Sequence, residues 1–334
     1  LGYGEKMKIE GFDVEKRVLV VAEIGVNHNG NLGLAKEMIK EAKASDVDAV
    51  KFQIYHTENL TNDPKEAEIL KRYELPSASF FELSKLAKEN GLIFLATPFD
   101  KEAVDLVANL SPAIKIASGD ITNIPLIEYV AKKDKPIILS TGGSTMEEIV
   151  AALERIEKIN RRLIRESQVI LLHSILSYPA PLSSVNLFSI PFLHQSLNFT
   201  VGYSDHTEGT SACLYSVSLG ARVVEKHFKL NENCPDSQVS SDLEEMKTLV
   251  REIRLIEGML GERKKEPGEC ELANIKKARR SLVASCDIKK GEIITEEMLC
   301  SLRPAEGISP CDIYKVVGKK AISNIKKGSL MREQ

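Results

Sequence analysis

The sequence lacks tryptophan, and it lacks any apolar run of the ~18 residues that a membrane-spanning helix needs. An excess of either charge is missing as well, because 45 Lys and Arg residues face 48 Asp and Glu residues, for a net charge of -3. This balance gives no reason to expect nucleic acid or an anionic membrane surface as a partner. We therefore expect neither of these among the binding partners.

Closely spaced cysteine pairs are also absent, since none of the six cysteines belongs to a C-x-x-C motif. In a chain of 334 residues this pattern is typical of reduced cysteines rather than of a disulfide framework or a zinc knuckle. The first 17 residues are polar and mixed in charge, unlike a signal peptide. These features together predict a cytoplasmic protein.

What the sequence does contain is a series of eight short apolar runs, each ending in polar or ionisable residues and separated by stretches of helical period. The runs are Val18–Glu23, Ala49–Gln53, Ile93–Thr97, Ala113–Ser118, Pro136–Thr141, Val169–His173, Thr200–His206 and Arg222–His227. Alternation of buried strands with amphipathic helices predicts βα units and a parallel sheet. Eight units in ~250 residues predict a closed (β/α)₈ TIM barrel in the α/β class.

The composition of the sequence changes after Gly261, where a charged stretch containing proline and glycine follows. We predict a barrel domain at residues 1–262, a linker at 263–278 and a small β-rich domain at 279–334. Two similar segments, Asp287–Gly291 and Asn324–Gly328, suggest that the small domain is pseudo-symmetric.

Two histidines mark the first candidate site, because His206 and His227 end neighbouring predicted strands. Adjacent strands lie about 4.8 Å apart, so two imidazoles at matching heights can share one divalent metal. Imidazole suits Mn, Fe, Co or Zn better than Mg or Ca. The alternative is that each histidine makes only local hydrogen bonds.

Lys51 and Lys115 lie inside apolar strands, where an unpaired ammonium group is costly. Either lysine could form a Schiff base with a carbonyl substrate, or both could bind an anion. Nearby hydroxyl residues, among them Ser118 and Ser140, favour a cradle for phosphate and carboxylate; purely structural pairing is the third interpretation. Glu23 ends the first strand and is a candidate general base.

Several segments, in order along nearly the whole chain, resemble the sialic acid synthase family, whose members make nonulosonic acids such as N-acetylneuraminate, legionaminate and pseudaminate. The segments are Ala22–Gly30, Lys51–Gln53, Thr97–Phe99, Lys115–Ser118, Ser140–Gly142, Tyr178–Pro181, Gly202–His206 and Glu225–Phe228. The tail from about residue 280, with Arg303–Pro304, resembles the family's antifreeze-like (SAF) domain.

The resemblance implies a transferase that condenses phosphoenolpyruvate (PEP) with an N-acyl hexosamine to give a nonulosonate and phosphate. It implies that His206 and His227 hold a divalent metal, Mn²⁺ first, with Mg²⁺ or Co²⁺ as alternatives, and that Glu23 serves the proton transfers. Lys51, Thr97, Lys115, Ser118, Ser140 and Ser204 would bind PEP, and Gln53, Tyr178, Asp236 and Arg303 would bind the sugar. In this family the small domain of one subunit covers the partner's barrel, so a domain-swapped homodimer is expected, with Arg303 on the neighbour's sugar.

Some positions depart from the family pattern. His173 is followed by Ser174, Ile175 and Leu176 where Cys-Thr is usual and neuraminate synthases then carry asparagine, and the loop before Asp236 is short. These changes leave the identity of the sugar open. The alternatives are PEP condensation with a phosphorylated sugar, a Schiff-base aldolase, and a non-catalytic carbohydrate-binding protein.

Overall fold

The computed structural model describes residues 7–262 and 264–333, so the ends of the predicted domains at residues 1–6 and 334, and residue 263 of the predicted linker, lie outside the described residues. The chain divides into two compact units, Leu1–Gly261 and Glu262–Gln334. No helix in the described part of the chain combines the length and the apolar character needed to cross a membrane.

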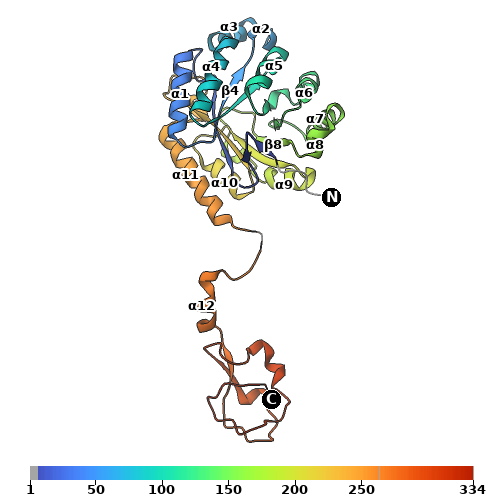
Figure 1. Cartoon of the computed structure of the whole chain (residues 1–334), viewed down its shortest axis with the longest axis vertical. Coiled ribbons are helices and arrows are strands. Elements are labelled where there is room, and N and C mark those ends of the chain that lie inside the picture. Colours follow the sequence, from blue (N-terminus) through green and yellow to red (C-terminus); the bar gives the residue numbers. More distant parts are fainter. Residues whose placement is uncertain (1–6, 263, 334) are drawn as a thin grey trace. The chain divides into compact units, whose positions relative to one another are not determined.

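The first unit is the predicted TIM barrel, drawn in blue to orange in Figure 1. Its eight strands are β3 (Leu19–Gly25), β4 (Ala49–Ile54), β5 (Ile93–Pro98), β6 (Ile114–Ile116), β7 (Ile137–Ser140), β8 (Val169–Ser174), β9 (Thr200–Asp205) and β10 (Val223–Phe228). Each strand pairs in parallel with the next, and β10 pairs with β3 to close the ring. A two-residue strand, β11 (Ser240–Ser241), extends the sheet beside β10.

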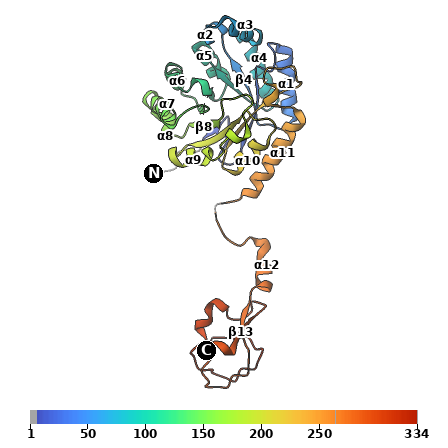
Figure 2. The ribbon, with the colours of Figure 1, turned by 180° about the vertical axis from the view of Figure 1, so that it is seen from behind.

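Helices surround the strands in both views of the barrel (Figures 1 and 2). They are α1 (Leu32–Ala44), α2 (Thr57–Leu60), α3 (Pro64–Tyr73), α4 (Ser77–Glu89), α5 (Lys101–Leu110), α6 (Ile124–Ala131), α7 (Met146–Ile159), α8 (Arg161–Arg165), α9 (Ser189–Leu197), α10 (Ser211–Ser218) and α11 (Leu243–Leu260), with 3₁₀ turns η1 (Ser118–Asp120), η2 (Leu182–Ser184) and η3 (Ser237–Val239). Helix α1 shows the common pattern: Asn31 caps its start, and Ala35, Met38, Ile39 and Ala42 face the core at helical spacing.

The inward-facing residues of the strands change from apolar to polar along the strands, and this change positions the site. Near the amino-terminal ends the inward residues are apolar and form one cluster with Met7, Ile9 and Val14, which lie in or next to the short hairpin β1 (Lys8–Ile9) and β2 (Phe12–Asp13). The strand residues of that cluster are Leu19, Val21, Ala49, Leu95, Ala113, Ile138, Ile170, Leu172 and Val223. Two residues further along several strands, the inward positions become polar, so ionisable groups gather at the carboxyl end.

Gly202 allows three strands to approach one another. A Cβ atom at this position would lie 2.5 Å from the Val223 carbonyl oxygen and 2.6 Å from a methyl group of Leu172. Because β9 lies between β8 and β10, any larger residue here would push the strands apart.

The second unit has its own core, which contains Leu282, Ile288, Ile294, Val316 and Met331. Its elements are α12 (Glu269–Ala278), β12 (Ser281–Ala284), η4 (Glu296–Met298), β13 (Leu299–Leu302) and η5 (Pro310–Lys315), and β12 and β13 are antiparallel. The stretch at 264–278 that its composition marks as a linker thus contains a ten-residue helix, α12.

The two similar segments of the small unit lie against each other. Ile288 and Ile325 form an antiparallel bridge. The Lys290 amide donates to Asn324 Oδ1, and the Lys327 amide donates to Asp287 Oδ1, both at 2.8 Å. These reciprocal hydrogen bonds confirm the predicted local pseudo-symmetry.

Candidate active site

A cavity of about 300 Å³ opens at the carboxyl end of the barrel. It is lined by Glu23, Lys51, Gln53, Thr97, Phe99, Lys115, Ala117, Ser118, Gly119, Ser140, Leu176, Tyr178, Ser204, His206, Glu225 and His227. The structure thus brings together every predicted site residue of the barrel except Asp236, which lies directly behind His227. Strands that are far apart in the sequence supply this single site, as expected for the fold.

Lys51 is the centre of a buried charge cluster. Its Nζ atom lies 3.1 Å from Glu23 Oε2 and 3.1 Å from Glu225 Oε2, and it donates to Thr97 Oγ1 at 3.3 Å. Burial lowers the pKa of Lys51, but the two carboxylates outweigh this effect and raise it above the usual value. Lys51 therefore stays charged, which suits anion binding and disfavours a Schiff base.

The two carboxylates beside Lys51 have different pKa values. Burial raises the pKa of Glu23 above its ordinary value, although Lys51 opposes the shift. Burial acts the same way on Glu225, but Lys51 and Lys115 overcome it and lower its pKa to about 2. Ser204 also donates to Glu225 Oε1 at 2.8 Å. Glu225 is therefore a fixed negative charge, and Glu23 is the carboxyl group suited to proton transfer.

Lys115 forms the second cationic point of the cavity. Its Nζ atom donates to Ser140 Oγ at 2.7 Å and to the Ile116 carbonyl oxygen at 3.3 Å. Burial lowers the pKa of Lys115 to about 8, and repulsion from Lys51 adds to this shift. Since an anion would restore the charged form, Lys115 is suited to binding a phosphate or carboxylate.

The two predicted metal ligands lie next to each other, with the ring centroids of His206 and His227 5.5 Å apart. Nδ1 of His206 donates to the Ile175 carbonyl oxygen at 2.7 Å, which leaves Nε2 with a free lone pair. Burial lowers the pKa of His206 to about 4, so its ring is neutral at pH 7. Tyr178 packs against this ring at a centroid distance of 4.0 Å.

His227 is held by a carboxylate. Its Nδ1 atom lies 3.2 Å from Asp236 Oδ2. Burial lowers the pKa of His227, but the contact with Asp236 outweighs burial and raises it. Within the described residues, no set of three or more His, Cys, Asp or Glu side chains is arranged to hold a metal. The candidate donor set is therefore two imidazoles, one of them beside a carboxylate, and these residues would suit a Mn²⁺-type ion.

The remaining predicted sugar residues are divided between the two units. Gln53 Nε2 donates to Glu23 Oε1 at 3.4 Å, so it lies beside the proposed base. Arg303 is exposed and directly follows β13 in the second unit. Its predicted contact with a partner's sugar stays a prediction.

Sequence reasoning did not assign Glu225 or Phe99 to the site, whereas it identified Leu176 as a departure from the family pattern that bears on the sugar. Glu225 lies two residues before His227 on the same strand, so alternation of side chains would have placed both inside the barrel. Leu176 lines the cavity. Ser174, which also departs from the family pattern, lies close to the imidazole site, with its Oγ atom 3.4 Å from His206 Nδ1.

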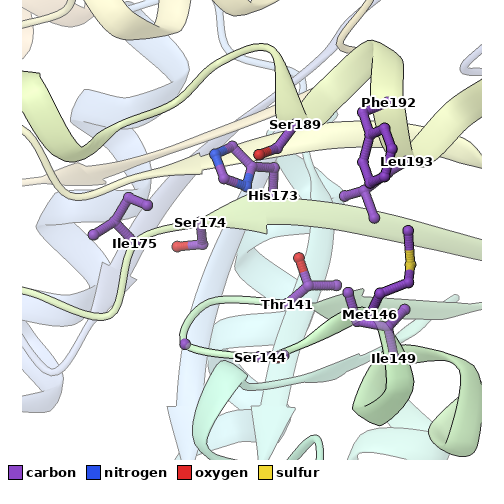
Figure 3. Close-up of a pocket in the computed structure, with 11 residues that line it drawn as sticks. Thr141, Ser144, Met146, Ile149, His173, Ser174, Ile175, Ser189, Phe192 and Leu193 are labelled. Atoms are coloured by element: carbon purple, nitrogen blue, oxygen red, sulfur yellow. The ribbon is translucent and has the colours of Figure 1, made fainter.

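A second cavity of about 220 Å³ lies beside the first, between the ends of β7 and β8 and helix α9. In Figure 3, Phe192 and Leu193 lie on one side of it and Met146 and Ile149 on the other. None of the described residues lining this cavity carries a full charge at pH 7, because burial lowers the pKa of His173. It therefore does not suit a multiply charged anion, and the first cavity is the candidate for chemistry.

Comparison with known proteins agrees with this geometry. The NeuB family model matches residues 38–265, and the SAF domain model matches residues 279–333. The N,N'-diacetyllegionaminic acid synthase of Campylobacter jejuni is 41% identical over 336 residues, covering 95% of this chain and 100% of that protein. The human N-acetylneuraminate-9-phosphate synthase is 31% identical over 334 residues, covering 94% and 91%.

A solved structure gives the same result for the fold. The crystal structure of the N-acetylneuraminic acid (sialic acid) synthetase of Leptospira borgpetersenii, in complex with citrate, superimposes with a TM-score of 0.73 at 35% identity, covering 78% of this chain and 90% of that one. The chain is thus an enzyme of the transferase class and belongs to the NeuB family, with a C-terminal SAF domain.

Proposed function

We propose that this enzyme condenses PEP with an N-acyl hexosamine to give a sialic acid-like nonulosonate and inorganic phosphate. The observation that carries the proposal is the buried cluster of Glu23, Lys51, Glu225 and Lys115 beside two imidazoles in one cavity. This arrangement offers two cations for a small polyanion, one carboxyl group with a raised pKa, and two imidazoles that could bind a metal.

Lys51 and Lys115 bind the phosphate and carboxylate of PEP, together with hydroxyl groups that can donate to the remaining acceptor oxygens. The hydroxyl residues are Thr97, Ser118, Ser140 and Ser204. These contacts fix the enol carbon of PEP toward the imidazole side of the cavity. Lys51 is already neutralised by carboxylates, so Lys115 supplies most of the new attraction.

The acceptor sugar lies over the imidazoles, where Gln53, Tyr178 and Asp236 orient it. His206 and His227 would hold a divalent metal, Mn²⁺ first, and the bound metal would polarise the aldehyde oxygen of the open-chain sugar as a Lewis acid. Tyr178 packs on His206 and shields that side of the site from water.

The reaction forms one carbon–carbon bond, and at C2 it replaces the bond to the phosphate oxygen by a bond to the oxygen of water. C3 of PEP attacks the aldehyde carbon, whose oxygen takes up a proton. Water adds to the resulting cation at C2 while Glu23 accepts a proton from it, and the tetrahedral intermediate then expels phosphate. Glu225 keeps Lys51 in place through these steps and does not exchange protons, because its pKa is about 2.

The enzyme is further proposed to act as a domain-swapped homodimer in the cytoplasm, with Arg303 of each chain reaching the partner's sugar. The exposed apolar side chains of the loop after β8 support this assembly, since Leu176, Leu182 and Phe188 are each at least half exposed in a single chain. Sedimentation should show a dimer; a monomer at working concentration would refute the assembly.

The acceptor is identified by incubating the enzyme with PEP, Mn²⁺ and one sugar at a time, and by analysing the products by mass spectrometry. N-acetylmannosamine, its 6-phosphate and diacetamido trideoxyhexoses form the panel. A nonulosonate from any of them supports the proposal and names the acceptor. Borohydride trapping of a PEP- or sugar-derived adduct on Lys115 would instead establish Schiff-base chemistry and overturn it.

A further inference from the structure

The carboxylate beside His227 lies in a loop that makes hydrogen bonds both within itself and to distant parts of the chain. Asp236 follows residues Asn231, Glu232 and Asn233, all of which are exposed. The loop has no regular structure between the end of β10 and η3. Yet Asp236 Oδ2 is placed 3.2 Å from the buried imidazole of His227. Asn27, a residue outside the loop, adds a contact to those made within it.

We propose that Asn27, acting with Ser240, is a positioning residue that holds Asp236 against His227 and thereby sets the affinity of the imidazole pair for its metal. Asn27 lies in the loop between β3 and α1 and is 2% exposed. The described lining of the cavity does not include it, so it acts through other residues. The part of this inference that concerns the metal rests on the proposed function.

Both backbone polar groups of Asp236 are hydrogen-bonded, the carbonyl oxygen twice, since it also accepts from the Val239 amide at 3.1 Å. Its amide donates to Asn27 Oδ1 at 3.0 Å, and its carbonyl oxygen accepts from Ser240 Oγ at 2.6 Å. With both groups fixed, only the short side chain of Asp236 remains free to rotate. Its carboxylate is therefore confined to the neighbourhood of His227.

Asn27 completes a closed network around these contacts. Its Nδ2 atom donates to Ser240 Oγ and to the Phe228 carbonyl oxygen, each at 2.9 Å. Both donors and one acceptor position of the amide side chain are thus used. Because Phe228 directly follows His227, one side chain holds both partners of the imidazole–carboxylate pair.

This arrangement has a measurable consequence, because groups that orient a metal-binding imidazole typically contribute 10- to 100-fold to metal affinity. Asn27→Ala should weaken Mn²⁺ binding about tenfold in the full-length protein, measured by the electron paramagnetic resonance signal of free Mn²⁺. Ser240→Ala should weaken it less, because the amide of Asp236 is still held. In an Asp236→Asn background, Asn27→Ala should add less than about twofold, since the group it positions is already lost.

Asn29 provides a matched control in the same loop. It also bridges to the Asp236 loop, donating from Nδ2 to the Asn233 carbonyl oxygen at 2.6 Å, but it is exposed and does not touch Asp236. Its φ of 52° suits glycine. Asn29→Gly should therefore leave the dissociation constant for Mn²⁺ unchanged within about twofold.

A second readout needs no metal. In the metal-free protein, the imidazole N–H of His227 that faces Asp236 should give a slowly exchanging proton resonance, and this resonance should disappear in Asn27→Ala and Ser240→Ala. If the wild-type protein binds no Mn²⁺, the metal part of the proposed function fails, and this resonance alone decides the positioning role.

Two results would overturn the inference. One is an unchanged Mn²⁺ affinity and an unchanged resonance in a folded Asn27→Ala protein. The other is that Asn27→Ala lowers the Mn²⁺ affinity equally in the wild-type and in the Asp236→Asn background. Should Asn27→Ala not fold, Ser240→Ala, which lacks a single hydroxyl group, is judged by the same two criteria.

Discussion

At the scale of single residues, Glu23 and Glu225 both contact the ammonium group of Lys51, but their pKa values are shifted in opposite directions. Both are buried and both lie 3.1 Å from Lys51. Glu225 has a second cation nearby in Lys115 and a hydroxyl donor in Ser204, whereas Glu23 accepts a long hydrogen bond of 3.4 Å from the Gln53 amide. Their surroundings, and not their chemical identity, assign proton transfer to Glu23.

Replacing Glu23 tests this assignment. Glu23→Gln keeps the size of the side chain, and Lys51 keeps its contact with Glu225, so the fold should persist. We expect kcat to fall about 10²- to 10⁴-fold, the range typical for a general acid–base group, with the KM for PEP changed less than about threefold. A kcat within threefold of wild type would exclude Glu23 from proton transfer.

The pKa of Lys115, about 8, predicts the pH dependence of PEP binding. The amine is charged below this pH and binds the anion; it loses its proton as the pH rises through 8. The KM for PEP should therefore increase from pH 7 to 9.5, while kcat, which reports the PEP-bound state, changes less. Lys115→Arg, which stays charged, should remove the increase.

A second variant, Glu225→Gln, should change the pH at which the KM for PEP begins to increase. Glu225 raises the pKa of Lys115, so its loss should start the increase in KM at lower pH. A KM for PEP that is flat across this range in the wild-type protein would contradict the role of Lys115.

Sequence reasoning found most of these residues because each ends an apolar strand, and strand ends meet at one mouth of a barrel. It did not find Glu225, which lies two residues before His227 in the middle of β10 rather than at the end of the strand. The contact of Asp236 with His227 could not be predicted, because the loop that carries Asp236 has no regular structure and is hydrogen-bonded to Asn27, which is distant in the sequence.

At the scale of elements, a buried ion pair joins the two strands that carry the imidazoles. Lys226 on β10 and Asp205 on β9 are both 0% exposed and lie 2.8 Å apart. They alternate with the inward residues, so they face the helices rather than the cavity. Tyr203 and Thr207 also donate to the Asp205 carboxylate, which completes its hydrogen bonding.

Lys226→Met should destabilise the barrel by about 3–5 kcal/mol, because it leaves a buried carboxylate without its cation. The double variant Asp205→Asn with Lys226→Met should recover much of that loss, as measured by urea unfolding. Lys36→Met breaks the exposed pair with Glu82 and should cost less than about 1 kcal/mol. Equal losses for Lys226→Met and Lys36→Met would refute this role of the buried pair.

The eight strands were predictable because each is short, apolar and bounded by polar residues. The predicted run at Ala113–Ser118 shortens to Ile114–Ile116, since Ser118 begins a 3₁₀ turn. The partner of Lys226 could not be inferred, because alternation tells which face a side chain occupies but not which strand residue lies opposite. Helix α12 lies within a stretch whose charge, proline and glycine content indicates a linker.

At the scale of the whole molecule, the two units have separate cores, so each should fold alone. A chain ending at Gly261 should keep PEP binding, because all its proposed ligands are in the barrel. Its KM for the sugar should increase at least about tenfold, and Arg303→Ala in the full chain should show part of the same effect. Unchanged sugar kinetics in both proteins would refute the role of Arg303.

The central claim is that the polar end of this barrel joins PEP to a sugar with the help of a metal. The most direct test is phosphate release from PEP with Mn²⁺, measured with and without the acceptor sugar and before and after EDTA. We predict release that requires both sugar and metal and that returns when Mn²⁺ is restored. Release without sugar, or full activity in EDTA, would contradict the account.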